Sequence, residues 1–297
     1  MNNNYLAIDI GGTSIKVAIV NKKGNLISKK SYLTPQDTYE GLLVSVRKII
    51  AHYKNEYKIS GIGFAIPAVT DSMNGIIKSK GSLIYIKNKH FVQDLKETEG
   101  LPIIIENDAN CAALAEVWLG SAKDNKNIVF LVIGTGIGGA VINNRKVVSG
   151  ANLFTGEFGY GIHNFDYENL TGNIWSLTSA TQILVNKAAK NLGIDANQLN
   201  GKKVFQLAKE NDSLRKLIDE FYFNLAIGIH NIQYYIDPEK IIVGGGISQR
   251  ANLIKEINYR LRIIYKRLGI DEIFPNLDTC TFHNDANLLG AVYNYIR

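Results

Sequence analysis

The chain has 297 residues, of which 46% are hydrophobic and 20% charged, a balance typical of a soluble globular protein. Its length favours two domains over a single core, and it contains no run of the ~18 apolar residues that a membrane span requires. The net charge of +6 comes from small, scattered lysine clusters, which argues against a nucleic-acid-binding surface.

The first half of the chain alternates short apolar runs with amphipathic segments. Apolar runs bounded by turns predict strands, and apolar residues recurring every three or four positions predict helices. These patterns predict strands at Tyr5–Asp9, Ile15–Val20, Leu26–Tyr32, Ile59–Ile66 and Leu101–Glu106, and helices at Thr38–Tyr53 and Ala109–Leu119. Asp108 precedes the second helix and is expected to be its N-cap, a position that acidic residues favour.

The second half repeats this theme from Ile128 onward. We expect strands at Ile128–Ile133, Ala140–Ile142 and Ile241–Val243, helices at Ser179–Leu192, Ser213–Tyr235 and Asn252–Arg267, and a closing segment at Asp285–Arg297. The repetition predicts a duplicated α/β fold with two lobes. We place the N-terminal lobe at residues 1–118 plus 285–297 and the C-terminal lobe at residues 119–284.

Three glycine-rich turns stand at the ends of predicted strands, at Asp9–Thr13, Gly134–Gly139 and Gly244–Ile247. Glycine lets a backbone approach an oxyanion closely, and successive N–H groups in such a turn form an anion-binding concavity. Each turn taken alone is also compatible with a purely structural role. Neither of the first two leads into a helix, which disfavours a P-loop and a dinucleotide-binding motif. Three such turns in one chain favour a single nucleotide site.

The predicted nucleotide site has a phosphate-binding part and a base-binding part. The hydroxyls of Thr13 and Thr135 and the ammonium group of Lys16 can contact phosphate, and Asp9 can hold Mg2+ through water. The bare backbone of the third turn leaves room for a flat base. The candidate nucleotide-binding residues are Asp9, Gly11, Gly12, Thr13, Lys16, Gly134, Thr135, Gly136, Gly138, Gly244, Gly245, Gly246 and Ile247.

Two acidic residues are candidates for substrate chemistry. Asp108 follows a buried strand, where a carboxylate can accept the proton of an attacking hydroxyl during phosphoryl transfer; a plain helix cap is the alternative. Glu157 lies in the glycine-flanked loop Gly156–Tyr160, and charged acceptors bind sugar hydroxyls strongly; an ordinary surface turn is the alternative. The five histidines lack metal-ligand spacing, and Cys111 and Cys280 are expected to be buried reduced thiols.

Six segments carry a resemblance to a known family. They are Asp9–Lys16, Glu106–Ala113, Gly134–Gly139, Gly156–Gly159, Gly244–Ile247 and Asn284–Ala291. In this order they resemble the motifs of the ROK family (repressors, open reading frames and sugar kinases) within the hexokinase–actin superfamily. The resemblance implies two actin-like (ribonuclease H-like) lobes with a central cleft that closes on Mg-ATP and a hexose.

The same resemblance implies roles for residues of the sugar site. Asp108 would accept the proton of the sugar 6-hydroxyl, and Asn107 would hold a neighbouring hydroxyl. Glu157 would bind hydroxyls near the C1–C2 edge of the sugar. Gly81 and Ser82 would belong to the sugar-binding loop, on a looser alignment.

The chain departs from the family pattern at two places. Tyr160 stands where the family usually has a zinc-binding histidine, and residues His163–Ser179 contain no cysteine, so we expect no structural zinc. Trp175 stands near the position of a second sugar-binding glutamate. We include Tyr160 and Trp175 among the candidate substrate-binding residues, with the Trp175 ring as a stacking face for an aglycone or second sugar. A core tryptophan is the alternative.

The zinc-less pattern resembles the β-glucoside kinase branch, whose members phosphorylate the 6-hydroxyl of the non-reducing glucose of cellobiose and related sugars. Glucokinase and N-acetylmannosamine kinase are the alternatives among kinases. A sugar-responsive repressor is disfavoured because Asp9 already belongs to the phosphate hairpin, which leaves no room for a DNA-binding domain. Asn107, Asp108 and Glu157 together disfavour a chaperone-like or cytoskeletal ATPase. We expect a cytoplasmic homodimer that binds ATP, Mg2+ and a sugar, and neither nucleic acid nor membrane.

Overall fold

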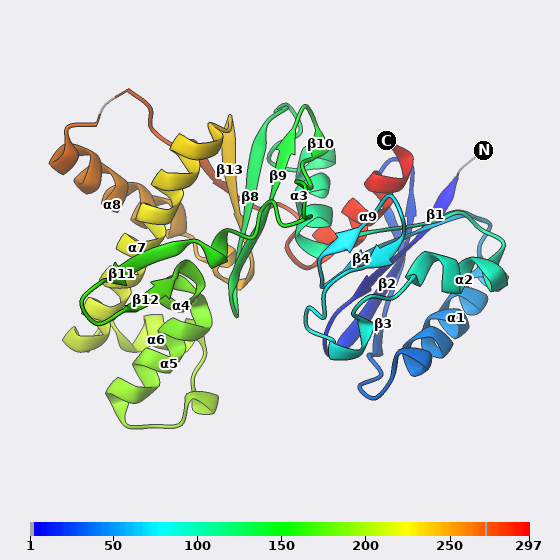
Figure 1. Cartoon of the computed structure of the whole chain (residues 1–297), viewed down its shortest axis with the longest axis horizontal. Coiled ribbons are helices and arrows are strands. Elements are labelled where there is room, and N and C mark those ends of the chain that lie inside the picture. The colour runs from blue at the N-terminus through cyan, green and yellow to red at the C-terminus, as the bar shows by residue number, and fades with distance from the viewer. Residues whose placement is uncertain (1–2, 271) are drawn as a thin grey trace. The chain divides into compact units, whose positions relative to one another are not determined.

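Two five-stranded sheets form the framework of the computed structural model, which describes residues 3–270 and 272–297 (Figure 1). The first sheet has the order β3-β2-β1-β4-β7, with β1 (Asn4–Ile10), β2 (Ser14–Asn21), β3 (Leu26–Leu33), β4 (Ile59–Ile66) and β7 (Ile103–Asn107). The first three strands form an antiparallel meander, β4 runs parallel to β1, and β7 runs parallel to β4. β1 and β4 are buried along nearly their whole length because helices cover both faces of the sheet.

The two faces of this sheet differ in side-chain size. The covering helices are α1 (Tyr39–Glu56), α2 (Phe91–Glu99), α3 (Asp108–Leu119) and α9 (Ala286–Ile296). Helices α1 and α2 share a core with the large apolar side chains of β1 and β4. On the α9 side, a Cβ on Gly63 would lie 2.4 Å from the Ala291 carbonyl oxygen. A Cβ on Gly290 would lie 1.7 Å from the Cys111 carbonyl oxygen. Small residues therefore let α9 approach β4 and α3 closely.

The second sheet repeats the pattern of the first. Its order is β10-β9-β8-β13-β14, with β8 (Ile128–Ile133), β9 (Ile137–Asn143), β10 (Lys146–Val147), β13 (Lys240–Gly244) and β14 (Leu277–Thr279). β10 pairs antiparallel with β9, and β13 runs parallel to both β8 and β14. This correspondence confirms the predicted duplicated α/β fold.

Five helices accompany the second sheet: α4 (Trp175–Ser179), α5 (Thr181–Leu192), α6 (Gly201–Leu207), α7 (Asp212–Ile236) and α8 (Leu253–Leu268). The helix predicted from residue 179 begins at Thr181, because the extended backbone of Ala180 separates it from α4. Two small sheets were not predicted, β5 (Thr70–Asp71) with β6 (Ile76–Ile77) and β11 (Ile162–Asp166) with β12 (Thr171–Ile174). The remaining predicted elements are confirmed to within a few residues.

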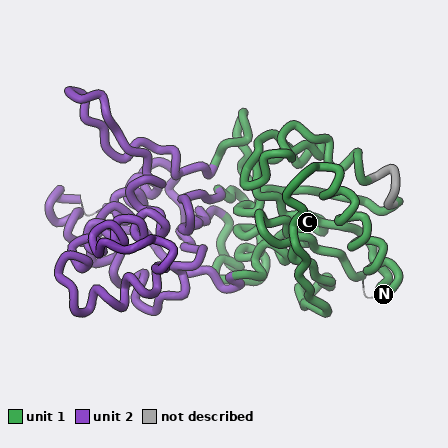
Figure 2. Tube along the Cα trace, turned by 90° about the horizontal axis from the view of Figure 1, so that it is seen from below, with its two compact units in different colours: residues 1–126, 141–155, 284–297 green, residues 127–140, 156–283 purple. Residues whose placement is uncertain are grey.

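The chain divides into two compact units (Figure 2). Unit 1 comprises residues 1–126, 141–155 and 284–297, and unit 2 comprises residues 127–140 and 156–283. β9 passes from unit 2 into unit 1 after Ala140, and α9 belongs to unit 1. In the described part of the chain, no helix combines the length and the apolar character needed to cross a membrane.

Candidate active site

The first glycine turn joins β1 to β2 and is held by residues that follow β3. The Gly11 N–H donates to the Ser14 carbonyl at 3.0 Å. The Thr34 hydroxyl donates to the Gly11 carbonyl at 2.7 Å, and the Gln36 side-chain amide donates to the Gly12 carbonyl at 2.8 Å. These contacts preorganise the turn, as a phosphate-binding loop requires.

Asp9 lies at the end of β1 beside this turn, with only 4% of its surface exposed. Its carboxylate accepts hydrogen bonds from Lys16 Nζ at 3.3 Å and from Asn287 Nδ2, on α9, at 3.1 Å. Burial raises the pKa of Asp9, and the Lys16 ammonium group opposes that shift. Lys16 and Asn287 already contact the Asp9 carboxylate directly. Asp9 therefore fits a Mg2+ ion that is held through water rather than by direct coordination.

The N-cap of α3 is Asn107, which corrects the expectation that Asp108 caps this helix. Asn107 Oδ1 accepts from the Asn110 N–H at 3.1 Å, and its Nδ2 donates to the Ala68 carbonyl at 3.2 Å. Asp108 is the first helical residue, and its Oδ1 accepts from the Ala109 N–H at 2.8 Å. An amide oxygen caps a helix as well as a carboxylate does. Asp108 consequently lies at the positive end of the α3 dipole, where negative charge is stabilised.

A buried carboxylate that the sequence analysis did not single out supports Asn107 and Asp108. Glu106 accepts from the Asn107 N–H at 2.8 Å and from Asn110 Nδ2 at 2.9 Å. It also accepts from the Ser72 hydroxyl at 2.9 Å, which ties the turn after β5 to this site. In the sequence, Glu106 stands at the end of a predicted buried strand, where a charged group has to be hydrogen-bonded. That position is the sequence feature that indicates its supporting role.

The predicted sugar loop at Gly81 and Ser82 lies beside the first glycine turn. Gly81 has a φ of +48°, and a Cβ there would lie 1.6 Å from the Pro67 carbonyl oxygen, so the position requires glycine. The Ser82 N–H donates to the same carbonyl at 3.3 Å. The Ser82 hydroxyl oxygen lies 3.3 Å from the position that a Cβ on Gly12 would occupy. Unit 1 therefore brings the predicted phosphate turn and sugar loop together.

The second glycine turn, between β8 and β9 in unit 2, is anchored to two helices. The Gln182 N–H on α5 donates to the Gly134 carbonyl at 3.2 Å, and the Ser176 hydroxyl on α4 accepts from the Ile137 N–H at 2.9 Å. A Cβ on Gly134 or on Gly138 would meet no atom within 4 Å. Packing within the protein does not demand glycine at these two positions, which favours close approach of a ligand as the reason.

The third glycine turn follows β13 and packs against the end of β8. Gly245 has a φ of +83°, and a Cβ there would lie 2.3 Å from the Ile133 carbonyl oxygen. A Cβ on Gly244 would lie 2.5 Å from the Phe130 ring, whereas one on Gly246 would meet no atom within 4 Å. The first two glycines therefore permit close packing, and the third borders open space.

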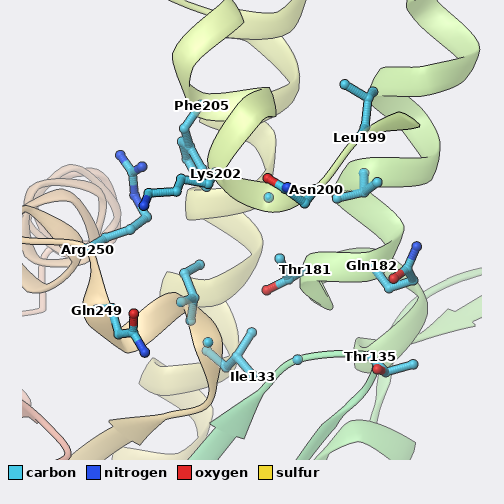
Figure 3. Close-up of a pocket in the computed structure, with 15 residues that line it drawn as sticks. Ile133, Thr135, Thr181, Gln182, Leu199, Asn200, Lys202, Phe205, Gln249 and Arg250 are labelled. Atoms are coloured by element: carbon cyan, nitrogen blue, oxygen red, sulfur yellow. The ribbon is translucent and has the colours of Figure 1, made fainter. Parts of the chain in front are cut away.

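A cavity of about 610 Å³ lies between the second and third turns (Figure 3). Its lining includes Gly134, Thr135, Gly246 and Ile247, which are four of the predicted nucleotide-binding residues. Apolar side chains from β8, α5 and the segment before α6 complete much of the wall. The volume is typical of small-molecule sites, and the mixture of bare backbone and apolar wall suits a flat heterocyclic base.

Basic residues that were not predicted also line this cavity. Lys202 and Phe205 of α6 gather on one side with Arg250, which follows the third turn (Figure 3). The Arg250 guanidinium carbon lies 3.5 Å from the centre of the Phe205 ring, and its Nε donates to the Tyr222 hydroxyl at 3.3 Å. No acidic side chain is among the described residues that form the wall, so the two cations favour an anionic ligand.

Glu157 and Tyr160 lie on a loop of unit 2 that precedes β11. Glu157 precedes a single 3-10 turn at Phe158–Tyr160, and its partial burial raises its pKa. Gly156 has a φ of +97°, and a Cβ there would lie 2.4 Å from the Gly139 carbonyl oxygen, so the loop is held against β9. Tyr160 is 67% exposed. A partly desolvated carboxylate beside an exposed ring is suited to binding hydroxyl groups.

Trp175 belongs to the core of unit 2, which corrects the expectation of an exposed stacking face. It is 4% exposed, and its indole N–H donates to the Asn224 carbonyl at 3.1 Å. Its ring covers Gly228 on α7 so closely that a Cβ there would come within 2.1 Å. Both faces of the ring are therefore unavailable to a substrate, and the alternative of a core tryptophan describes its packing.

We expect Trp175→Phe to lower stability without changing substrate preference. The change removes a buried hydrogen bond and part of the contact with Gly228, a loss of about 1–3 kcal/mol in the free energy of unfolding. Urea denaturation measures that loss, and the ratio of kcat/KM for cellobiose to that for glucose should stay within about twofold. A larger change in this ratio at unaltered stability would assign the ring to the substrate site.

The chain matches known proteins along nearly its whole length. The model of the ROK family matches residues 5–296. A β-glucoside kinase from Listeria monocytogenes is 32% identical over 294 residues, which cover 98% of this chain and 97% of the relative. One from Klebsiella pneumoniae is 30% identical over 292 residues, 97% of this chain and 95% of the relative. The crystal structure of a ROK family protein from Streptococcus pneumoniae in complex with sucrose has a TM-score of 0.89 at 33% identity, covering 99% of this chain and 98% of that one.

Proposed function

The chain belongs to the ROK family, has its actin-like α/β fold and is an ATP-dependent carbohydrate kinase; we propose that it phosphorylates the 6-hydroxyl of a β-glucoside such as cellobiose. The observation that carries this proposal is the carboxylate of Asp108 at the first position of α3, next to Asn107 and the buried Glu106. The β-glucoside kinases of Listeria and Klebsiella support the substrate class. The Streptococcus protein, which is crystallised with sucrose, supports a disaccharide substrate.

Asp108 acts as the general base in the proposed reaction. As the oxygen of the 6-hydroxyl bonds to the γ-phosphorus of ATP, the bond from that phosphorus to the β–γ bridging oxygen breaks and ADP leaves. The proton of the hydroxyl passes to the Asp108 carboxylate. The positive end of the α3 dipole stabilises negative charge at that carboxylate. Asn107 donates one amide N–H to the Ala68 carbonyl, and we assign its second amide N–H to a neighbouring sugar hydroxyl.

The cavity of unit 2 is the proposed site of the adenosine part of ATP. We assign the phosphates to the backbone at Gly134, Gly136 and Gly138 with the Thr135 hydroxyl, where added Cβ atoms at the first and third glycine would meet open space. In unit 1, the turn Gly11–Thr13 and Lys16 are the proposed contacts of the terminal phosphates. Asp9 would hold Mg2+ through water, and the ion would neutralise charge on the transferred phosphoryl group.

Four further residues are proposed to contact the sugar. In unit 1, Gly81 and Ser82 are assigned to the sugar loop. In unit 2, the Glu157 carboxylate is assigned to hydroxyls near the C1–C2 edge, and the exposed ring of Tyr160 takes the aglycone side that we had expected for Trp175. We further propose that the protein is a cytoplasmic homodimer. We also propose that it has no structural zinc, since residues 163–179 contain no cysteine.

A coupled ADP-release assay across cellobiose, gentiobiose, glucose, N-acetylmannosamine and fructose tests the substrate class. We expect kcat/KM for the two disaccharides to exceed that for each monosaccharide at least about tenfold, because contacts to the second sugar add binding in the transition state. Preference for a free monosaccharide would instead select glucokinase or N-acetylmannosamine kinase, and the kinase assignment would stand.

A further inference from the structure

The hairpin of β11 and β12, residues 162–174, is here called the arm. It belongs to neither five-stranded sheet, and among residues 3–270 and 272–297 its two strands pair only with each other (Figure 1). Four of its large apolar side chains are exposed: Ile162, Phe165, Tyr167 and Leu170. The base of the arm is held by a contact of 3.2 Å between His163 Nε2 and Asn224 Oδ1 on α7. Exposed apolar groups gathered on one element mark an interaction surface.

The tip of the arm is ordered by local hydrogen bonds. Asp166 Oδ1 accepts from the N–H groups of Glu168 and Asn169 at 3.0 and 3.1 Å, and its Oδ2 accepts from Asn169 Nδ2 at 2.8 Å. Tyr167 and Leu170 flank this turn and are 77% and 78% exposed. The tip therefore presents two large apolar groups in a defined conformation, with the two acidic residues Asp166 and Glu168 and no basic residue between 166 and 170.

A surface of complementary chemistry lies on α8 of the same unit. The buried side of this helix carries Leu253, Ile257, Leu261 and Tyr265. The opposite side, here called the α8 face, carries Lys255, Tyr259, Arg262, Ile263 and Lys266 at helical spacing. All five are exposed, so three cations surround an exposed apolar pair. Glu256, which lies beside this face, is ion-paired with Arg260.

We propose that the arm of one copy docks on the α8 face of a second copy, with Tyr167 and Leu170 against Tyr259 and Ile263 and the acids of the tip among the lysines and Arg262. Under two-fold symmetry, an arm and a receptor face on the same chain form a reciprocal contact, in which each copy gives one arm and receives one. Opposite charges around an apolar centre fix the partner and the register. This inference rests on the proposed homodimer and names its surface, and it does not depend on the identity of the sugar.

Sedimentation velocity on two double variants tests the exchange. The arm variant carries Tyr167→Ser and Leu170→Ser, and the face variant carries Tyr259→Ser and Ile263→Ser. We expect the wild type to be a dimer at about 50 µM and each variant to have a dimer dissociation constant raised at least about a hundredfold, because both contacts lose their apolar centre. An equimolar mixture of the two variants should form heterodimers, since one of the two contacts is then intact.

A matched control removes two exposed apolar side chains elsewhere. Leu33 and Met73 are 83% and 98% exposed, and Leu33→Ser with Met73→Ser should leave the dimer unchanged. Circular dichroism of every variant verifies folding. A monomeric wild type, a face variant that stays dimeric, or a mixture without heterodimers would each overturn the inference. Kinase activity measured on the same samples separates this failure from a failure of the proposed reaction.

Discussion

Replacing Asp108 by Asn is expected to lower kcat at least about a thousandfold, within the range of general-base catalysis. The KM values for ATP and for the sugar should change by less than about threefold. Asn has nearly the same shape, and its oxygen can still accept from the Ala109 N–H that Asp108 Oδ1 contacts now, so the start of α3 keeps its structure. The amide cannot take up the proton of the sugar hydroxyl. Steady-state kinetics and calorimetric titration with sugar and with ATP measure these quantities.

The matched control for this variant is Asp124→Asn, which makes the same chemical change at an exposed position of unit 1. It should leave kcat within about twofold of the wild type, as surface substitutions usually do. An Asp108→Asn enzyme that keeps more than about a tenth of the wild-type kcat would refute the assignment of the base. The assignment of the adenosine cavity would be unaffected by that result.

Gly246→Val is expected to raise the KM for ATP at least about thirtyfold, which corresponds to ~2 kcal/mol of lost binding. Gly246 has no positive φ, and a Cβ on it would meet no protein atom within 4 Å. The valine side chain would therefore extend into the space at the wall of the cavity of about 610 Å³. Sugar binding measured without nucleotide should not change. Calorimetric titration with ATP and with sugar, together with ATP kinetics, provides the comparison.

Two neighbouring substitutions make this test specific. Gly246→Ala adds one methyl group to the same space and should raise the KM for ATP less than valine does. Gly245→Ala should lower the melting temperature instead, because that residue has a φ of +83° and an added Cβ would lie 2.3 Å from the Ile133 carbonyl oxygen. Unchanged ATP binding in a folded Gly246→Val protein would place the adenosine elsewhere.

The three glycine turns show how far local sequence reasoning extends. A glycine cluster at the end of an apolar run predicts a tight turn from backbone geometry alone, and all three turns are found between the predicted elements. The sequence does not distinguish Gly245 from Gly246, since the difference lies in which atoms surround each one. Packing against β8 requires glycine at Gly245, whereas Gly246 borders the cavity.

Asn107 and Trp175 show where the same reasoning fails. Asn107 and Asp108 are both good N-caps, and the choice between them depends on the Ala68 carbonyl and the Glu106 carboxylate, which hold the Asn107 side chain and backbone. An aromatic residue in a glycine-rich and polar stretch is equally consistent with exposure and burial. Trp175 is buried against Gly228 on α7, where a Cβ would come within 2.1 Å of the ring.

The sequence by itself determined the duplicated order of strands and helices, the turns and the membership of the ROK family, because periodicity, glycine geometry and contiguous motifs are local properties. It also singled out Asp108 and Glu157, whose roles stay predictions. Only the tertiary structure decided that Glu106 supports the start of α3, that Trp175 is core, and that Lys202 and Arg250 line the cavity with Gly246. Each of these depends on contacts between residues far apart along the chain. The residue pattern of a single strand or helix does not show which distant residues pack against it.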